Sequence, residues 1–267
     1  MPTMREDIYR IYLEFLETAE KKRRWNIFED IPWNELESEK ATDVVRRRVE
    51  IYCAEEMYVP DYSAAGLRMT RGMFGMAWFQ ALWAFEESRH GLAFREYLTR
   101  SGLRTEAEFA ALEAHVFASQ WRLPFDRSRQ MVCYGALQEG ATYTAYKLQR
   151  DCARARSDAV LEAIFFLVGR DEAAHAGFYR SMIELELAAD RAGTIADLAN
   201  VFYHFKMPGD GLIRDYRRRL RDSGAGISPR LFLEGVVMPL LTTLKIGRGE
   251  FRAALHKQTL ENFAAAS

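Results

Sequence analysis

The stretch "WAFEESRHGLAFREYL", residues 83–98, decides the fold, because it puts a carboxylate and an imidazole one helical turn apart. Glu87 and His90 are separated by about 300° of an α-helix, so both side chains project to the same side. The positions at helical spacing on either side form one stripe: Met76, Gln80, Trp83, Phe94 and Tyr97. Such a largely apolar stripe is typical of a helix that faces the interior of a bundle.

The motif occurs a second time, in "FFLVGRDEAAHAGFY", residues 165–179. Glu172 and His175 repeat the spacing, and their stripe also runs through apolar residues. A single Glu-x-x-His motif would also suit a solvated glutamate beside a buried neutral histidine. Two such motifs, with no lysine or arginine on either stripe, instead predict a bound cation, because buried charges are costly unless they are paired or coordinate a metal.

A further glutamate precedes each motif at a similar distance in the sequence. Glu139 precedes Glu172, and Glu56 precedes Glu87, and both lie among residues suited to burial. Glu55 is the alternative to Glu56, although its stripe contains an arginine. Two helix pairs would thus present the same kinds of ligand to a shared centre.

The donor types indicate the class of metal. Carboxylates and imidazoles without thiolates suit iron or manganese. One acid from each of two helices, with a Glu-x-x-His motif from each of two others, is the pattern of ferritin-like di-iron bundles. We therefore expect two iron ions, with manganese as the alternative. The candidate metal ligands are Glu56, Glu87, His90, Glu139, Glu172 and His175.

The rest of the chain also reads as helix. Its 267 residues include only seven prolines, and 49% are apolar, which is enough for the core of one large domain. We expect an all-α fold, a ferritin-like four-helix bundle core with additional flanking helices, in a single domain over residues 1–267. The expected helices span residues 4–23, 40–70, 74–100, 104–119, 126–155, 158–188, 194–205, 211–222, 228–246 and 249–263.

Composition excludes several classes of function. A formal net charge of −1 gives no reason to expect nucleic acid as a partner. No long uncharged apolar run suggests a membrane span, and the charged N-terminus does not resemble a signal peptide. Three cysteines without a C-x-x-C pair favour reduced thiols in a cytoplasmic protein.

Five segments resemble the soluble acyl-[acyl-carrier-protein] desaturase family, here in a short bacterial form. They are "WNIFEDIPW" from residue 25, "EEMYVPDY" from residue 55, "EESRHG" from residue 86, "LQEGAT" from residue 137 and "DEAAH" from residue 171. The matches extend from residue 25 to about residue 180 and leave the C-terminal third without a matched motif. Two residues depart from the family pattern, because Gly140 and Ala174 each stand where the family has an arginine, while Arg89 is kept.

The resemblance implies roles for three further residues. Thr142 matches a threonine near the oxygen-binding side of the metal pair, although a helix threonine bonded to its own backbone is the alternative. Asp171 matches an aspartate bonded to the histidine of the other motif, here His90. Trp25 matches the end of that chain, where electrons enter, with an ordinary packing tryptophan as the alternative.

The same resemblance implies an activity and partners. It implies a di-iron, dioxygen-dependent desaturase that introduces a double bond into a saturated acyl chain carried on acyl carrier protein. A ferredoxin-type electron donor and a homodimer are expected with it. The alternatives are another di-iron oxygenase of this fold (a hydroxylase, an N-oxygenase or an aldehyde-deformylating enzyme) and a non-catalytic ferritin-type iron protein.

Overall fold

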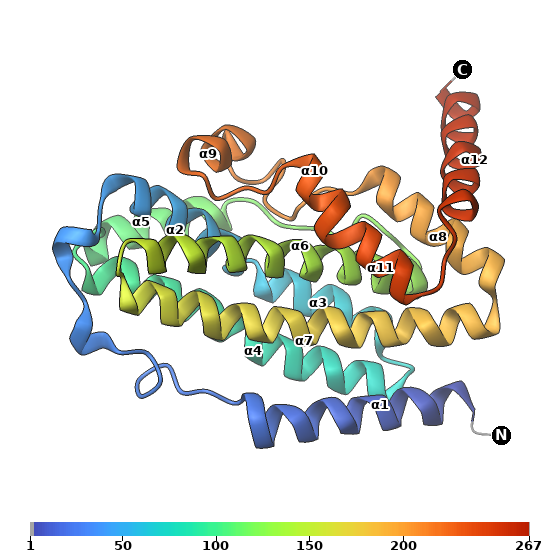
Figure 1. Cartoon of the computed structure of the whole chain (residues 1–267), viewed down its shortest axis with the longest axis horizontal. Helices are drawn as coiled ribbons and strands as arrows, with labels where there is room; N and C mark the ends of the chain where they lie inside the picture. The colour runs from blue at the N-terminus through green and yellow to red at the C-terminus, as the bar shows by residue number, and fades with distance from the viewer. Residues whose placement is uncertain (1–2, 267) are drawn as a thin grey trace.

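The structure, a computed structural model, describes residues 3–266, and every regular element over these residues is a helix (Figure 1). The all-α prediction is therefore confirmed. None of the helices in this described part is both long and apolar enough to cross a membrane. The longer helices are α1 (Met4–Thr18), α2 (Asp43–Glu56), α3 (Val59–Thr70), α4 (Phe74–Arg100), α5 (Glu106–Phe117), α6 (Ser128–Ala155), α7 (Ala159–Ala189), α8 (Arg191–His204) and α12 (Arg248–Ala266).

The shorter elements join these helices. They are the π-turns η1 (Ala19–Arg23) and η4 (Leu233–Val237), the 3-10 turns η2 (Trp33–Glu35) and η3 (Ser38–Lys40), and the helices α9 (Tyr216–Ser223), α10 (Pro229–Phe232) and α11 (Met238–Thr243).

The core of the bundle consists of α4, α6, α7 and the pair α2 and α3 (Figure 1). α6 and α7 form an extended antiparallel pair, α4 packs on α7, and α2 and α3 together cover α4. α1 lies along α4 and α7 on the outside of this core. Two apolar clusters fill the two ends of the bundle. One is centred on Phe79 and Tyr179 and the other on Phe94 and Phe165.

The expected single helix over residues 40–70 is wrong, because the chain turns at Met57 and Tyr58 between α2 and α3. Pro60 lies in the first turn of α3. In a continuous helix its ring would clash with the carbonyl of Glu56, and it has no N–H to donate. The break therefore makes Glu56 the last residue of α2.

The expected helix over residues 228–246 is also interrupted, by the π-turn η4. This turn packs against α6 at Gly140, where a Cβ atom would come within 2.8 Å of Val236 Cγ1. A side chain at position 140 would overlap η4. The structure thus gives a steric reason for glycine at this position.

Candidate metal centre

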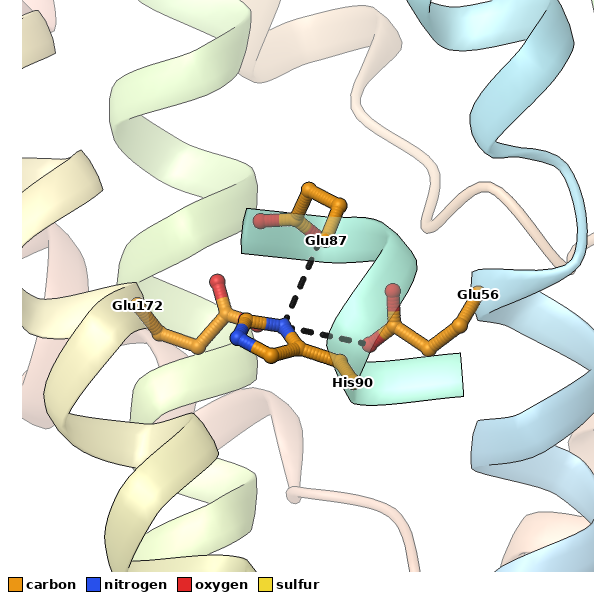
Figure 2. A group of neighbouring side chains, drawn as sticks. All are labelled: Glu56, Glu87, His90 and Glu172. Carbon is orange, nitrogen blue, oxygen red and sulfur yellow. Dashed lines mark ion pairs between the residues drawn. The ribbon is translucent and has the colours of Figure 1, made fainter. Parts of the chain in front are cut away.

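The six candidate ligands meet at the middle of the bundle, between the two apolar clusters. Glu56 ends α2, Glu139 lies at the middle of α6, and the two Glu-x-x-His motifs lie at the middle of α4 and α7. All six side chains are buried. Figure 2 shows three of the carboxylates converging on His90.

The donors form two groups of four. Within each group the ligand atoms lie within 4.8 Å of one another. Glu87 and Glu172 belong to both groups. Glu56 and His90 complete one group, and Glu139 and His175 complete the other. This arrangement suits two metal ions joined by two bridging carboxylates.

The distances show how the two shared carboxylates, Glu87 and Glu172, are oriented. His90 Nδ1 lies 3.2 Å from Glu172 Oε1 and 3.6 Å from Glu87 Oε2. His175 Nδ1 lies 2.9 Å from Glu87 Oε1 and 3.7 Å from Glu172 Oε2. Each shared carboxylate therefore turns one oxygen to each half of the centre.

Buried polar atoms without hydrogen bonds test whether these residues fit a metal pair. Within residues 3–266, the buried atoms Glu87 Oε1, His90 Nδ1, Glu139 Oε2, Glu172 Oε1, Glu172 Oε2 and His175 Nδ1 have no hydrogen-bond partner. Buried polar groups in proteins are normally satisfied. All six atoms face the shared centre, and carboxylate and imidazole donors suit iron or manganese. The residues therefore fit a metal pair.

The contacts of Glu56 and Glu55 show which of these two glutamates joins the cluster. Glu56 Oε1 lies 4.0 Å from His90 Nδ1 and accepts a hydrogen bond of 2.5 Å from the Tyr146 hydroxyl. Glu55 instead accepts a hydrogen bond from the Tyr216 hydroxyl of α9. Burial raises the pKa of the Glu55 carboxyl to about 7. Glu56 is the member of this pair that joins the cluster.

The Nε2 atom of each histidine, on the side of the ring away from the cluster, contacts an acid of the other motif. His90 Nε2 lies 3.2 Å from Asp171 Oδ2, as the resemblance implied, and His175 Nε2 lies 2.9 Å from Glu86 Oε2. Each acid directly precedes the bridging glutamate of its own motif. Glu86 was missed by the sequence analysis, although the paired acids of "EESRH" and "DEAAH" are its signal. Such partners fix the orientation of a metal-binding imidazole.

A buried arginine joins the two acids. Arg23, at the end of η1, donates to Asp171 Oδ1 at 2.5 Å and to Glu86 Oε2 at 3.0 Å. Burial favours a raised pKa for Asp171, but the hydrogen bond from His90 and the charges of His90 and Arg23 hold this pKa well below its usual range. The sequence analysis missed Arg23 because it lies outside the two stripes.

Trp25 and Thr142 lie near the centre. Trp25 is buried, and its indole N–H donates to Asp171 Oδ2 at 2.7 Å. Trp25, Asp171 and His90 thus form a continuous hydrogen-bonded chain. Thr142 lines a small cavity beside Glu56 and Glu87, while its hydroxyl donates to the carbonyl of Gln138 at 3.0 Å. The bond to the helix's own backbone, which was the alternative for Thr142, is therefore present, and the side chain also borders the cavity beside two clustered carboxylates.

Several of the clustered groups have pKa values that are shifted in favour of bound protons. Burial and the charge of Glu87 raise the pKa of Glu56 well above its usual value, and burial and Glu172 do the same for Glu139. Burial lowers the pKa of His90, but the charge of Glu87 and the other carboxylates raise it well above its ordinary value. Metal ions would have to displace these protons.

Known proteins match this fold and sequence. A Mycobacterium tuberculosis protein named as acyl-[acyl-carrier-protein] desaturase DesA1 is 28% identical over 253 residues, covering 83% of this chain and 71% of the relative. A solved structure titled as acyl-ACP desaturase DesA2, from M. tuberculosis H37Rv, matches with a TM-score of 0.65 at 17% identity. It covers 94% of this chain and 99% of that one, and this likeness shows the fold.

The family model described as fatty acid desaturase matches residues 54–222, which include all six clustered residues. That match covers more than half of the chain. The chain therefore belongs to the fatty acid desaturase family, and it is an oxidoreductase.

Proposed function

We propose that the protein is a di-iron, dioxygen-dependent desaturase that introduces a double bond into a saturated acyl chain delivered on acyl carrier protein. The observation that carries this proposal is the pair of four-donor groups sharing Glu87 and Glu172. The unsatisfied donor atoms at their centre support a metal pair there. The name of the M. tuberculosis relative supports the acyl carrier substrate.

Glu56, Glu87, His90, Glu139, Glu172 and His175 would hold the two ions, with manganese as the alternative metal. Bound iron would supply the reduction of dioxygen and the oxidising power needed to remove hydrogen from an unactivated C–H bond.

The chain's own residues orient the centre and exclude water. Asp171 and Glu86 accept the Nε2 protons of the two histidines, which leaves both Nδ1 atoms directed inward. The apolar clusters on either side keep the centre dry. Thr142 stands at the cavity wall where dioxygen and the acyl chain would meet. Trp25, through Asp171, would conduct electrons from a ferredoxin-type donor, and a homodimer is the proposed assembly.

The test is mass spectrometry of acyl carrier proteins bearing saturated chains, incubated with the iron-loaded protein, ferredoxin, reductant and oxygen. We expect a loss of two hydrogens from the chain. Glu172→Gln removes a bridging charge and should abolish this product. Glu184→Gln, on the exposed surface of the same helix α7, should leave it unchanged.

Other products would change the proposal. A gain of one oxygen on the acyl chain would make the protein a hydroxylase. No change in any acyl chain, together with oxidation of a free amine or aldehyde, would place it among the other di-iron oxygenases.

A further inference from the structure

The cavity beside the clustered carboxylates has two adjoining parts. The nearer part is lined by Glu56, Glu87 and Thr142. The farther part is lined by Gln80, Tyr134 and Tyr179, among others. Both parts are bordered by Tyr62, Trp83, Gln138 and Pro208, so they lie side by side.

The farther part is short. Gln80 precedes Glu87 by seven residues on α4, which corresponds to about 10 Å along the helix axis. An acyl chain reacting beside Glu87 would therefore reach Gln80 with only a short tail. Only a short tail beyond the reacting carbon would fit between Glu87 and Gln80.

Aromatic rings form the walls, and their polar atoms are used by the protein. The Tyr62 hydroxyl donates to the carbonyl of Glu55 at 3.0 Å, and the Tyr134 hydroxyl donates to that of Lys206 at 3.1 Å. The Trp83 indole N–H donates to Glu139 at 2.9 Å. These rings consequently present apolar surface to the cavity, which suits a hydrocarbon tail.

The far end of the cavity is more polar than its walls, because two buried polar side chains face it. Gln80 and Tyr179 are 2% and 4% exposed. The Gln80 amide N–H donates to the Tyr179 hydroxyl at 2.8 Å. Over residues 3–266, no further partner accompanies the amide oxygen of Gln80 or the hydroxyl proton of Tyr179. One acceptor and one donor therefore remain at the far end of the cavity.

Two glycines make room for this pair. A Cβ atom on Gly66 would come within 2.1 Å of the Gln80 amide oxygen, and one on Gly135 would come within 2.7 Å of the Tyr179 ring. Buried donors and acceptors in proteins are normally hydrogen-bonded. A ligand that both accepts and donates would satisfy the pair at once.

We propose that the far end of this cavity binds a hydroxyl group, so that the preferred substrates are short acyl chains with a hydroxyl at their far end. The hydroxyl oxygen would accept from Tyr179, and its proton would be donated to Gln80. The inference rests on the function proposed above for the reaction itself. Sites built to hydrogen-bond a substrate hydroxyl discriminate strongly against analogues that lack it.

The binding test follows tryptophan fluorescence, because Trp83 and Trp121 line the cavity. The probes are the methyl ester of octanoic acid and the same ester with a hydroxyl on its last carbon. We expect the hydroxylated ester to bind at least about tenfold more tightly. Tyr179→Phe and Gln80→Leu should each remove this preference. Tyr58→Phe removes a buried hydroxyl bonded to Val116 elsewhere and should keep it.

The outcomes are distinguishable. Equal or tighter binding of the plain ester by the unmodified protein would overturn the hydroxyl assignment, as would a preference that survives both substitutions in folded protein. Thermal melts establish that each variant is folded. A hydroxyl preference without desaturation of either carrier-bound chain would support the binding assignment while overturning the proposed reaction.

Discussion

At the scale of single residues, Arg23 supplies a positive charge that the second Glu-x-x-His motif does not carry itself. Arg89 precedes His90 and lies 3.4 Å from Asp171, the acid bonded to that histidine. The equivalent position before His175 is Ala174, which carries no charge. Glu86, the acid beside His175, has its nearer cation in Arg23, which the π-turn η1 directs into the core, and a more distant one in Arg24 at 3.7 Å. π-turns often mark functional positions in helices.

We predict that Arg23→Met lowers the free energy of unfolding by up to about 3–5 kcal/mol, because Glu86 and Asp171 lose the cation that they share and keep only the more distant Arg24 and Arg89. Metal affinity should fall about 10- to 100-fold, because both histidines lose part of their support. Adding Ala174→Arg to this variant should restore part of both losses by supplying a cation to Glu86. Denaturant titration and cobalt binding followed by absorption would measure these effects.

Lys22→Met provides the control, since Lys22 is exposed in the same π-turn. An Arg23→Met protein with unchanged stability and metal affinity would show that the two acids do not depend on this cation.

At the scale of elements, the approach of α6 to α7 depends on glycine. Gly135 on α6 faces the ring of Tyr179 on α7, and a Cβ atom there would overlap it. The contact brings the Tyr179 hydroxyl to the end of the cavity. Gly177 lies on α7 as well, but nothing lies within 4 Å of a Cβ atom at that position.

Gly135→Ala should therefore destabilise the protein by about 1–3 kcal/mol, through overpacking against a ring held in the core. Gly177→Ala should cost nothing and add up to about 1 kcal/mol, because alanine has the higher helix propensity. Urea denaturation of the two variants makes the comparison. Equal stability of the two variants would mean that α6 and α7 can move slightly apart without loss of stability.

At the scale of the whole molecule, the bundle encloses more acid than base at its centre. The groups with raised pKa values in the metal-free protein include Glu56, Glu139, His90 and His175. A raised pKa contributes stability below the ordinary value, and this contribution is lost as pH rises through the raised value. The ordinary values are 4.5 for the glutamates and 6.5 for the histidines.

We expect about two iron or manganese ions per chain by elemental analysis. Chelation should lower the melting temperature, because the carboxylates lose their counter-charge. The loss should grow as the pH rises above the ordinary values of these groups, because the metal-free protein then gives up its stabilising protons and the loaded protein does not. Zinc alone after iron supplementation, or the same pH profile with and without metal, would contradict a buried iron centre.

The sequence by itself determined the all-α class, the family and the set of acids and imidazoles that face inward. Helical periodicity is local, so the stripe through Glu87 and His90 could be read without knowing any partner. The break at Pro60 was also a local signal, although the sequence analysis carried the helix through it.

Only the tertiary structure decided which residues meet across the bundle. It brought Glu56 rather than Glu55 to the cluster, paired Glu86 with the histidine of the other motif, and directed Arg23 between the two acids. It also placed Gln80 and Tyr179 together at the end of the cavity. The physical reason is that periodicity shows which face of a helix is buried, whereas the partner on the facing helix depends on how segments distant in sequence pack together.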